Sequence, residues 1–227
     1  MEEKSEKNIL NEKWREVARI IFNAILVICA GIGTFLTVIE LGMAMTLSAF
    51  TIQSNLLCLI MSSVTLIRQV LKRNSDNRLY TFFKGMALLS ILLTFIVYNF
   101  VLKPYFNTTQ VQNATLANNL QHIIVPLMTV ADYFLFEKKG MYTMWHPFAW
   151  TAFPLYYVGY TAIYKAFGGM YKFSGNTVAK FPYFFLDYET FGLKTVGIWV
   201  LLIVIGFIGS SYLLVGLDRI LVKVQKR

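Results

Sequence analysis

The chain has 227 residues, of which 56% are hydrophobic and only 15% are charged. A soluble domain of this length is usually about half apolar and a quarter charged, so the composition argues against a soluble protein. The formal charge of +9 does not indicate a nucleic-acid partner, because the lysines and arginines lie between apolar runs rather than in a basic tail.

The N-terminal segment, MEEKSEKNILNEKWREVARI, does not have the pattern of a cleaved signal peptide. It is mixed in charge, and no small-residue cleavage site follows the first apolar run. We therefore expect that run to be retained as the first membrane span. Cys29 and Cys58 lie inside apolar runs, which favours buried thiols over a disulfide framework or a metal site.

Six apolar stretches are each long enough to cross a bilayer, which takes about 20 residues in a helix. Spans of this length must be helical, because lipid offers no hydrogen-bond partners to the backbone. We predict an all-α polytopic membrane protein, with residues 1–227 forming a single bundle of six transmembrane helices. The predicted spans are residues 17–39, 50–71, 79–101, 117–136, 147–167 and 193–215.

The basic residues predict the orientation. Most of the 21 lysines and arginines fall in the N-terminal segment, in the connections after the second and fourth spans, and in the C-terminal tail, which places both termini in the cytoplasm. Lys84 is assigned to the connection after the second span, and Asp132 is expected to snorkel toward Lys138 or Lys139. The outer connection 168–192 is long and aromatic, and we interpret it as a lid or a partly re-entrant segment.

Two spans carry polar side chains that are unfavourable in lipid unless they face the bundle interior. The stretch SAFTIQSNLL opens the second span, and Thr51, Asn55 and Cys58 recur there at i, i+4 and i+7, so they share one face. The stretch NNLQHIIVPL places His122 near the start of the fourth span. Pro126 follows His122 by one turn and is expected to kink the helix and free a carbonyl.

Thr51 and His122 are predicted to lie at comparable depth in the outer leaflet, because both helices run inward and rise about 1.5 Å per residue. A threonine hydroxyl needs a base to become a nucleophile, and a neutral imidazole suits that task. Such a pair would cleave an ester or thioester of a lipid. Asp187 or Glu189 is a candidate to orient His122, as in a catalytic triad. Candidate oxyanion donors are Asn55, Asn119, Gln121 and a tyrosine.

The same side chains also fit roles without hydrolysis. A threonine in a membrane helix commonly bonds to its own helix, and His122 can make a purely structural hydrogen bond. Cys58 is a rival nucleophile, although an apolar environment keeps a thiol protonated. A small-solute transporter or lipid-binding membrane protein without catalysis is one alternative, and a membrane acyltransferase is another. Transporters more often show inverted repeats, and none is visible in the sequence.

Three stretches, AFTIQSNLL, LQHIIVPLMTVADYFLF and KFPYFFLDYETFG, resemble the androgen-induced membrane protein family in sequence and order. That family includes the androgen-dependent regulator of tissue factor pathway inhibitor, and the resemblance is strongest to its bacterial branch. It covers the second to the sixth span. The resemblance implies a six-span hydrolase of fatty acid esters of hydroxy fatty acids, with the family's threonine nucleophile at Thr51 and its histidine at His122.

The family's Tyr-Pro-aromatic segment falls on Phe181, Pro182 and Tyr183, with Phe181 in place of the usual tyrosine and the following acidic residue displaced to Asp187. We therefore expect an intramembrane lipid ester hydrolase in a bacterial cell membrane, acting on fatty-acyl esters without a metal or organic cofactor. The expected catalytic residues are Thr51 and His122, and the expected substrate-binding or oxyanion residues are Asn55, Asn119, Gln121, Tyr183 and Asp187.

Overall fold

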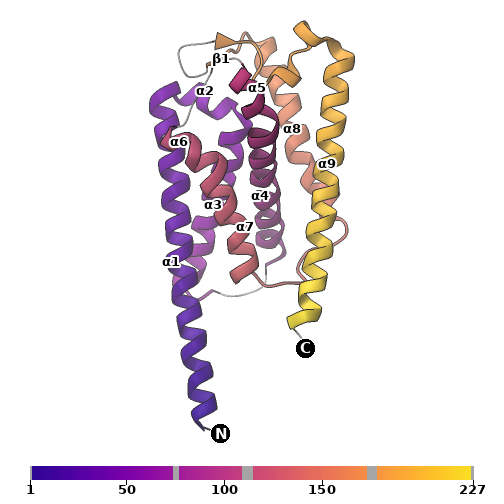
Figure 1. Ribbon diagram of the computed structural model, residues 1–227. Coiled ribbons are helices and arrows are strands. Elements are labelled where there is room, and N and C mark those ends of the chain that lie inside the picture. Colours follow the sequence, from indigo (N-terminus) through magenta and orange to yellow (C-terminus); the bar gives the residue numbers. More distant parts are fainter. Residues whose placement is uncertain (1, 74–76, 109–114, 173–177, 226–227) are drawn as a thin grey trace.

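The computed structural model describes residues 2–73, 77–108, 115–172 and 178–225, and this part of the chain is mostly helical. The long helices run along one another (Figure 1); they are α1 (Glu2–Leu41), α3 (Phe50–Val70), α4 (Arg78–Val97), α8 (His146–Ala166) and α9 (Tyr188–Gln225). The shorter helices are α2 (Met43–Ser48), α5 (Lys103–Thr108), α6 (Leu116–Asn119) and α7 (Val125–Phe136). Two π-helical turns, η1 (Tyr98–Leu102) and η2 (Leu120–Ile124), interrupt this pattern.

Within the described residues, four helices are long and apolar enough to cross a membrane. They cover Glu12–Leu41, Phe50–Val70, Arg78–Tyr105 and Tyr188–Lys223, and they are compatible with an integral membrane protein. The two other predicted spans, 117–136 and 147–167, correspond to the consecutive elements α6, η2 and α7 and to α8. The π turn divides the first of these, and the tyrosines, prolines and His146 of α8 lower its hydropathy.

Helix α1 starts long before the predicted first span and extends beyond the rest of the bundle (Figure 1). It ends next to Gly42, whose φ of 83° lies in the region that favours glycine, and α2 follows directly. The two chain ends lie at the same end of the bundle, while α2, α5 and β1 lie at the opposite end.

The connection between α8 and α9 is ordered against the bundle where it is described. Strand β1 (Tyr171–Lys172) pairs antiparallel with β2 (Val178–Ala179), and the 3₁₀ turn η4 (Phe184–Leu186) follows. The Phe184 ring stacks on Tyr105 with centroids 4.3 Å apart. Helix α9 then kinks at Gly192, which has φ 78° and ψ 154°.

Two apolar clusters lie at different depths around α4, α8 and α9. The outer cluster contains Phe50, Leu102, Tyr157, Phe185 and Leu186. The deeper cluster contains buried Leu88, Leu89, Trp150, Phe207, Leu214 and Val215, together with Tyr133 and Tyr142. Helices α4 and α8 approach closely here, since a Cβ at Gly85 would collide with the Trp150 ring.

Candidate active site

Thr51 and His122 meet although they are 71 positions apart in the chain. Thr51 lies in the first turn of α3, and its Oγ1 is 3.2 Å from Nε2 of His122 in the π turn η2. The other ring nitrogen, Nδ1, is 3.0 Å from the carbonyl oxygen of Asn118. A carbonyl can only accept, so in the neutral ring Nδ1 carries the hydrogen and Nε2 accepts from the Thr51 hydroxyl.

The helix around His122 exposes backbone carbonyls to side chains of neighbouring helices. In η2 the Val125 amide bonds to Leu120, five residues back, and Pro126 has no N–H to donate to the preceding turn. The carbonyl of His122 instead accepts from Asn99 Nδ2 at 3.1 Å. This bond fixes the π turn against η1, and Asn55 Nδ2 on α3 donates to the Gln121 carbonyl of the same turn at 3.2 Å. Together the two bonds hold His122 facing Thr51.

An aromatic ring covers the other side of the imidazole. Tyr98, the first residue of η1, stacks on His122 with ring centroids 3.7 Å apart and planes inclined by 22°. Its hydroxyl accepts a 2.6 Å hydrogen bond from Asn118 Nδ2. His122 is only 9% exposed. The ring is therefore held in one orientation, with a single nitrogen directed toward Thr51.

Tyr183, which precedes η4, lies beside Thr51 at the start of α3. Burial raises the pKa of Tyr183, and interactions of its hydroxyl with the Thr51 and Tyr157 side chains and with the backbone of Thr51 and Phe50 oppose that rise. Amides in the first turn of a helix have no partner within the helix and point toward such a group. The Tyr183 hydroxyl is thus polarised beside Thr51.

A cavity of about 60 Å³ opens beside Thr51. Its polar lining comes from Thr51, Thr94, Tyr98, Tyr157 and Tyr183. The rest of the wall is apolar and includes Phe50, Leu93, Val97, Leu102, Pro154, Val158, Phe185, Leu186, Val200, Ile203 and Val204. An apolar cleft with a few convergent polar groups is typical of a small-molecule site.

The predicted donors Asn55 and Gln121 are engaged in holding the helices together. Asn55 Nδ2 donates to the carbonyls of Thr51 (2.8 Å) and Gln121 (3.2 Å), and its Oδ1 has no hydrogen-bond partner within the described part of the chain. Gln121 Nε2 donates to the carbonyl of Gly33 and to Thr37 Oγ1. Asn119 is exposed on α6.

The two predicted carboxylates do not orient His122. Asp187 accepts from the amide (3.0 Å) and hydroxyl (2.7 Å) of Thr190 at the start of α9. Glu189 pairs with Lys165 and Lys180 on the outer surface. The group that accepts from His122 Nδ1 and so orients the ring is the backbone carbonyl of Asn118. A backbone carbonyl cannot be recognised from residue types, so the sequence pointed to acidic side chains instead.

Cys58 lies on the same buried face of α3 as Asn55, as the spacing predicts, and is 1% exposed. Its sulfur lies 3.6 Å from the carbonyl oxygen of Ala87 and 3.8 Å from Thr129 Oγ1. Of these two side chains, Thr51 and not Cys58 is the one in hydrogen-bond contact with His122.

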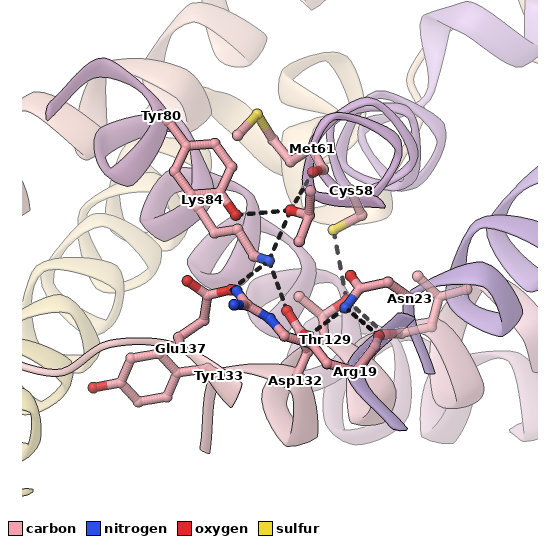
Figure 2. Close-up of polar contacts among 12 residues, drawn as sticks. Arg19, Asn23, Cys58, Met61, Tyr80, Lys84, Thr129, Asp132, Tyr133 and Glu137 are labelled. Carbon is pink, nitrogen blue, oxygen red and sulfur yellow. Dashed lines mark hydrogen bonds and ion pairs between the residues drawn. The ribbon is translucent and has the colours of Figure 1, made fainter. Parts of the chain in front are cut away.

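A second polar cluster surrounds Lys84, several turns away from Thr51 along α3, and Figure 2 shows its contacts in close-up. The Lys84 ammonium is 2.7 Å from Asp132 Oδ2, 2.8 Å from Glu137 Oε1 and 3.0 Å from Thr65 Oγ1. The predicted placement of Lys84 in a connection and of Asp132 beside Lys138 or Lys139 is wrong. Helix α4 begins at Arg78, so Lys84 lies almost two turns inside it and reaches Asp132 across the bundle interior.

Helix α1 completes this cluster. Arg19 lies 3.0 Å from Glu137 Oε1, and Asn23 Nδ2 donates to Asp132 Oδ1 at 3.0 Å. Burial favours the neutral acid of Glu137, but the positive charges of Lys84 and Arg19 outweigh it and hold the pKa of Glu137 below its usual value. The two cations and two carboxylates compensate one another.

Within the described residues, no group of three or more histidine, cysteine, aspartate or glutamate side chains is placed to hold a metal ion. No protein-family model, curated protein or solved structure matches the chain.

Proposed function

We propose that this chain is an intramembrane lipid ester hydrolase with Thr51 as nucleophile and His122 as general base. The observation that carries the proposal is the 3.2 Å contact between Thr51 Oγ1 and His122 Nε2 at the polar end of an apolar cavity. A hydroxyl paired with a base that is itself oriented by a third group is the usual arrangement of an activated nucleophile. Here that third group is the Asn118 carbonyl.

The proposed topology has six membrane crossings, with α6–η2–α7 and α8 as the fourth and fifth. Both chain ends lie at one end of the bundle, as an even number of crossings requires (Figure 1). The excess of lysine and arginine at that end supports a cytoplasmic location for both termini. The Thr51–His122 pair would then lie near the outer surface of a cell membrane, within reach of lipid-like substrates.

In the proposed reaction, His122 Nε2 takes the hydroxyl proton while Thr51 Oγ1 attacks the ester carbonyl carbon. The carbonyl electron pair moves to oxygen, and the Tyr183 hydroxyl donates to this oxyanion. Its own oxygen accepts from the amides at the start of α3, which strengthens it as a donor. When the intermediate collapses, the ester bond breaks and Nε2–H protonates the leaving alkoxide.

The product of this first step is an acyl-threonine. Water then attacks the acyl carbon, His122 accepts the water proton, and collapse returns that proton to Thr51 and releases the fatty acid. Fatty acid esters of hydroxy fatty acids are the substrates that the family resemblance favours. An acyltransferase would share the first step and use a second alcohol in place of water, so the products distinguish the two reactions.

The test uses purified protein in lipid nanodiscs, with release of fatty acid from acyl esters and labelling by a fluorophosphonate probe as readouts. Thr51→Val, which keeps the side-chain shape without the hydroxyl, should abolish both. His122→Ala should lower turnover by about 10²–10⁴-fold, the usual contribution of a general base. Labelling that persists in Thr51→Val would refute Thr51 as the nucleophile.

The chain offers a matched control for each variant. Thr151→Val removes a buried hydroxyl that bonds the Pro147 carbonyl of its own helix, at 2.7 Å. His146→Ala removes the second of the two histidines. Both controls should keep activity and labelling. Equal loss in the controls and in the site variants would contradict a specific role for Thr51 and His122.

A further inference from the structure

The cavity beside Thr51 has a roof, walls and a floor from different elements. Phe185 and Leu186 of η4 lie at its outer end, and α4, α8 and α9 form its walls. The deepest lining residues are Leu93, Pro154 and Val204, one on each of these helices. The cavity therefore extends inward from the Thr51 hydroxyl between three helices.

The floor is made of large side chains that are almost fully buried. About one turn below the deepest lining residues lie Leu89 on α4, Trp150 on α8 and Phe207 on α9, which are 2%, 0% and 1% exposed. These side chains belong to a single apolar cluster. The Trp150 ring is fixed further by its hydrogen bond to the Phe82 carbonyl, at 2.9 Å. The cavity thus ends at a rigid barrier.

We propose that this cavity holds the acyl chain of the ester, and that the floor of Leu89, Trp150 and Phe207 restricts the preferred substrates to short and medium acyl chains. The inference rests on the proposed function, because the covalent bond between the acyl group and Thr51 is what places the acyl chain in this cavity. The acyl group stays on Thr51 through both steps, so it needs room that adjoins Thr51. The alcohol must leave, and a closed pocket would retain it.

The depth of the cavity sets the length. Two pairs of lining residues mark the upper and lower ends of the cavity. Tyr98, which packs on His122, lies five residues from Leu93 along α4 and its continuation η1, and Val200 lies four residues from Val204 along α9. At about 1.5 Å per residue, the apolar space below Thr51 is roughly 6–8 Å deep. A butanoyl or hexanoyl chain fits such a space and an octanoyl chain reaches its floor, whereas a palmitoyl chain must bend back or displace the floor.

The principal test compares two phenylalanine substitutions at adjacent positions of α9. Val204→Phe fills the lower cavity, whereas Ile205→Phe places the same ring on the outer face, where Ile205 is 57% exposed. The readout is kcat/KM for a series of esters from acetate through butyrate and octanoate to palmitate. The unmodified protein should favour butyrate to octanoate over palmitate.

Val204→Phe should lower kcat/KM for octanoate by about tenfold or more relative to acetate, since hydrophobic pockets discriminate strongly against groups that no longer fit. Ile205→Phe should keep the original profile. Phe207→Leu should move the preference toward longer chains. Palmitate as the best ester, or identical profiles for Val204→Phe and Ile205→Phe, would overturn the acyl-pocket proposal while leaving hydrolysis by Thr51 intact.

A binding measurement separates this inference from the proposed function. In a Thr51→Val background, octanoate should displace a fluorescent fatty acid from the protein, and added Val204→Phe should weaken that displacement while added Ile205→Phe should not. If no ester is cleaved but this pattern holds, the proposed function fails and the acyl pocket stands. If displacement is the same in all three proteins, the acyl pocket fails.

Discussion

The imidazole of His122 is held by backbone carbonyls and an aromatic ring rather than by a carboxylate. The Asn118 carbonyl accepts from Nδ1, and the Tyr98 ring stacks on one face. From the sequence, helix rise alone predicts that Thr51 and His122 lie at comparable depth. Their contact also needs two π turns, and no residue pattern in the sequence indicates a π turn. Pro126 is the visible signal, because it predicts a freed carbonyl in the turn that contains His122.

Tyr183 provides the sharpest prediction at the residue scale. Tyr183→Phe keeps the ring in the cavity wall but removes the hydroxyl beside Thr51. If that hydroxyl donates to the oxyanion, kcat for ester cleavage should fall by about 10²–10³-fold, as for other single oxyanion donors. KM should change little, because the donor acts mainly on charge that develops in the transition state. Steady-state kinetics with one soluble ester measures both quantities.

Tyr156→Phe is the matched control, since Tyr156 is 57% exposed on α8 and does not line the cavity. It should leave kcat within about twofold of the unmodified value, as expected of a surface change. A Tyr183→Phe protein with unchanged kcat would assign the oxyanion to other donors.

The helices that carry the candidate site also meet in the second polar cluster. Lys84 lies on α4, Thr65 on α3, Asp132 on α7 and Asn23 on α1. Charges inside a membrane protein are tolerated when they pair within the bundle. This cluster therefore fixes how far each helix is inserted relative to its neighbours, and so it influences whether Thr51 and His122 face one another at the other end.

Removing the central cation should destabilise the bundle. Lys84→Met leaves Asp132 and Glu137 as buried carboxylates without their shared partner, and breaking such a pair from one side typically costs about 3–5 kcal/mol. Thermal unfolding of the nanodisc-embedded protein should show a clearly lower midpoint. Adding Asp132→Asn should recover part of the loss, because one unpaired charge is then removed.

Lys180→Met provides the control for that experiment. Lys180 also pairs with a glutamate, Glu189, but both side chains are largely exposed. Water already solvates such a pair, so its loss should leave the midpoint almost unchanged. Equal midpoints for Lys84→Met and Lys180→Met would show that the buried cluster contributes no more than a surface pair.

At the scale of the whole molecule, the helical class and the approximate position of each long helix follow from apolar run length in the sequence. The full length of α1 does not, because its first turns are polar and lie outside the apolar run. Similarly, the strand pair and η4 between α8 and α9 are placed by packing on the bundle. The stacking of Phe184 on Tyr105 depends on two segments far apart in the chain, which a local pattern does not show.

Six crossings predict an alternating pattern of accessibility along the chain. Arg73 follows α3 and Thr143 precedes α8, and both are exposed. The single-cysteine variants Arg73→Cys and Thr143→Cys should react with a membrane-impermeant maleimide only from the cytoplasmic side. Met43 and Val178 are also exposed, and the variants Met43→Cys and Val178→Cys should react only from the outside. The experiment needs a background in which Cys29 and Cys58 are replaced by alanine, with intact and inverted membrane vesicles labelled in parallel.

Thr143 and Val178 are the decisive labelling positions, because they lie on either side of α8 in the chain. Helix α8 is not one of the four described helices whose length and composition suffice to cross a membrane. A helix that crosses the membrane puts them on opposite sides. Because backbone groups in lipid must be paired, a fully helical α8 is able to cross despite its tyrosines, with several of these rings packed against one another and against Phe50. Labelling of both positions from the same side would show that α8 does not cross the membrane. The proposed acyl pocket would then lack one of its membrane-embedded walls.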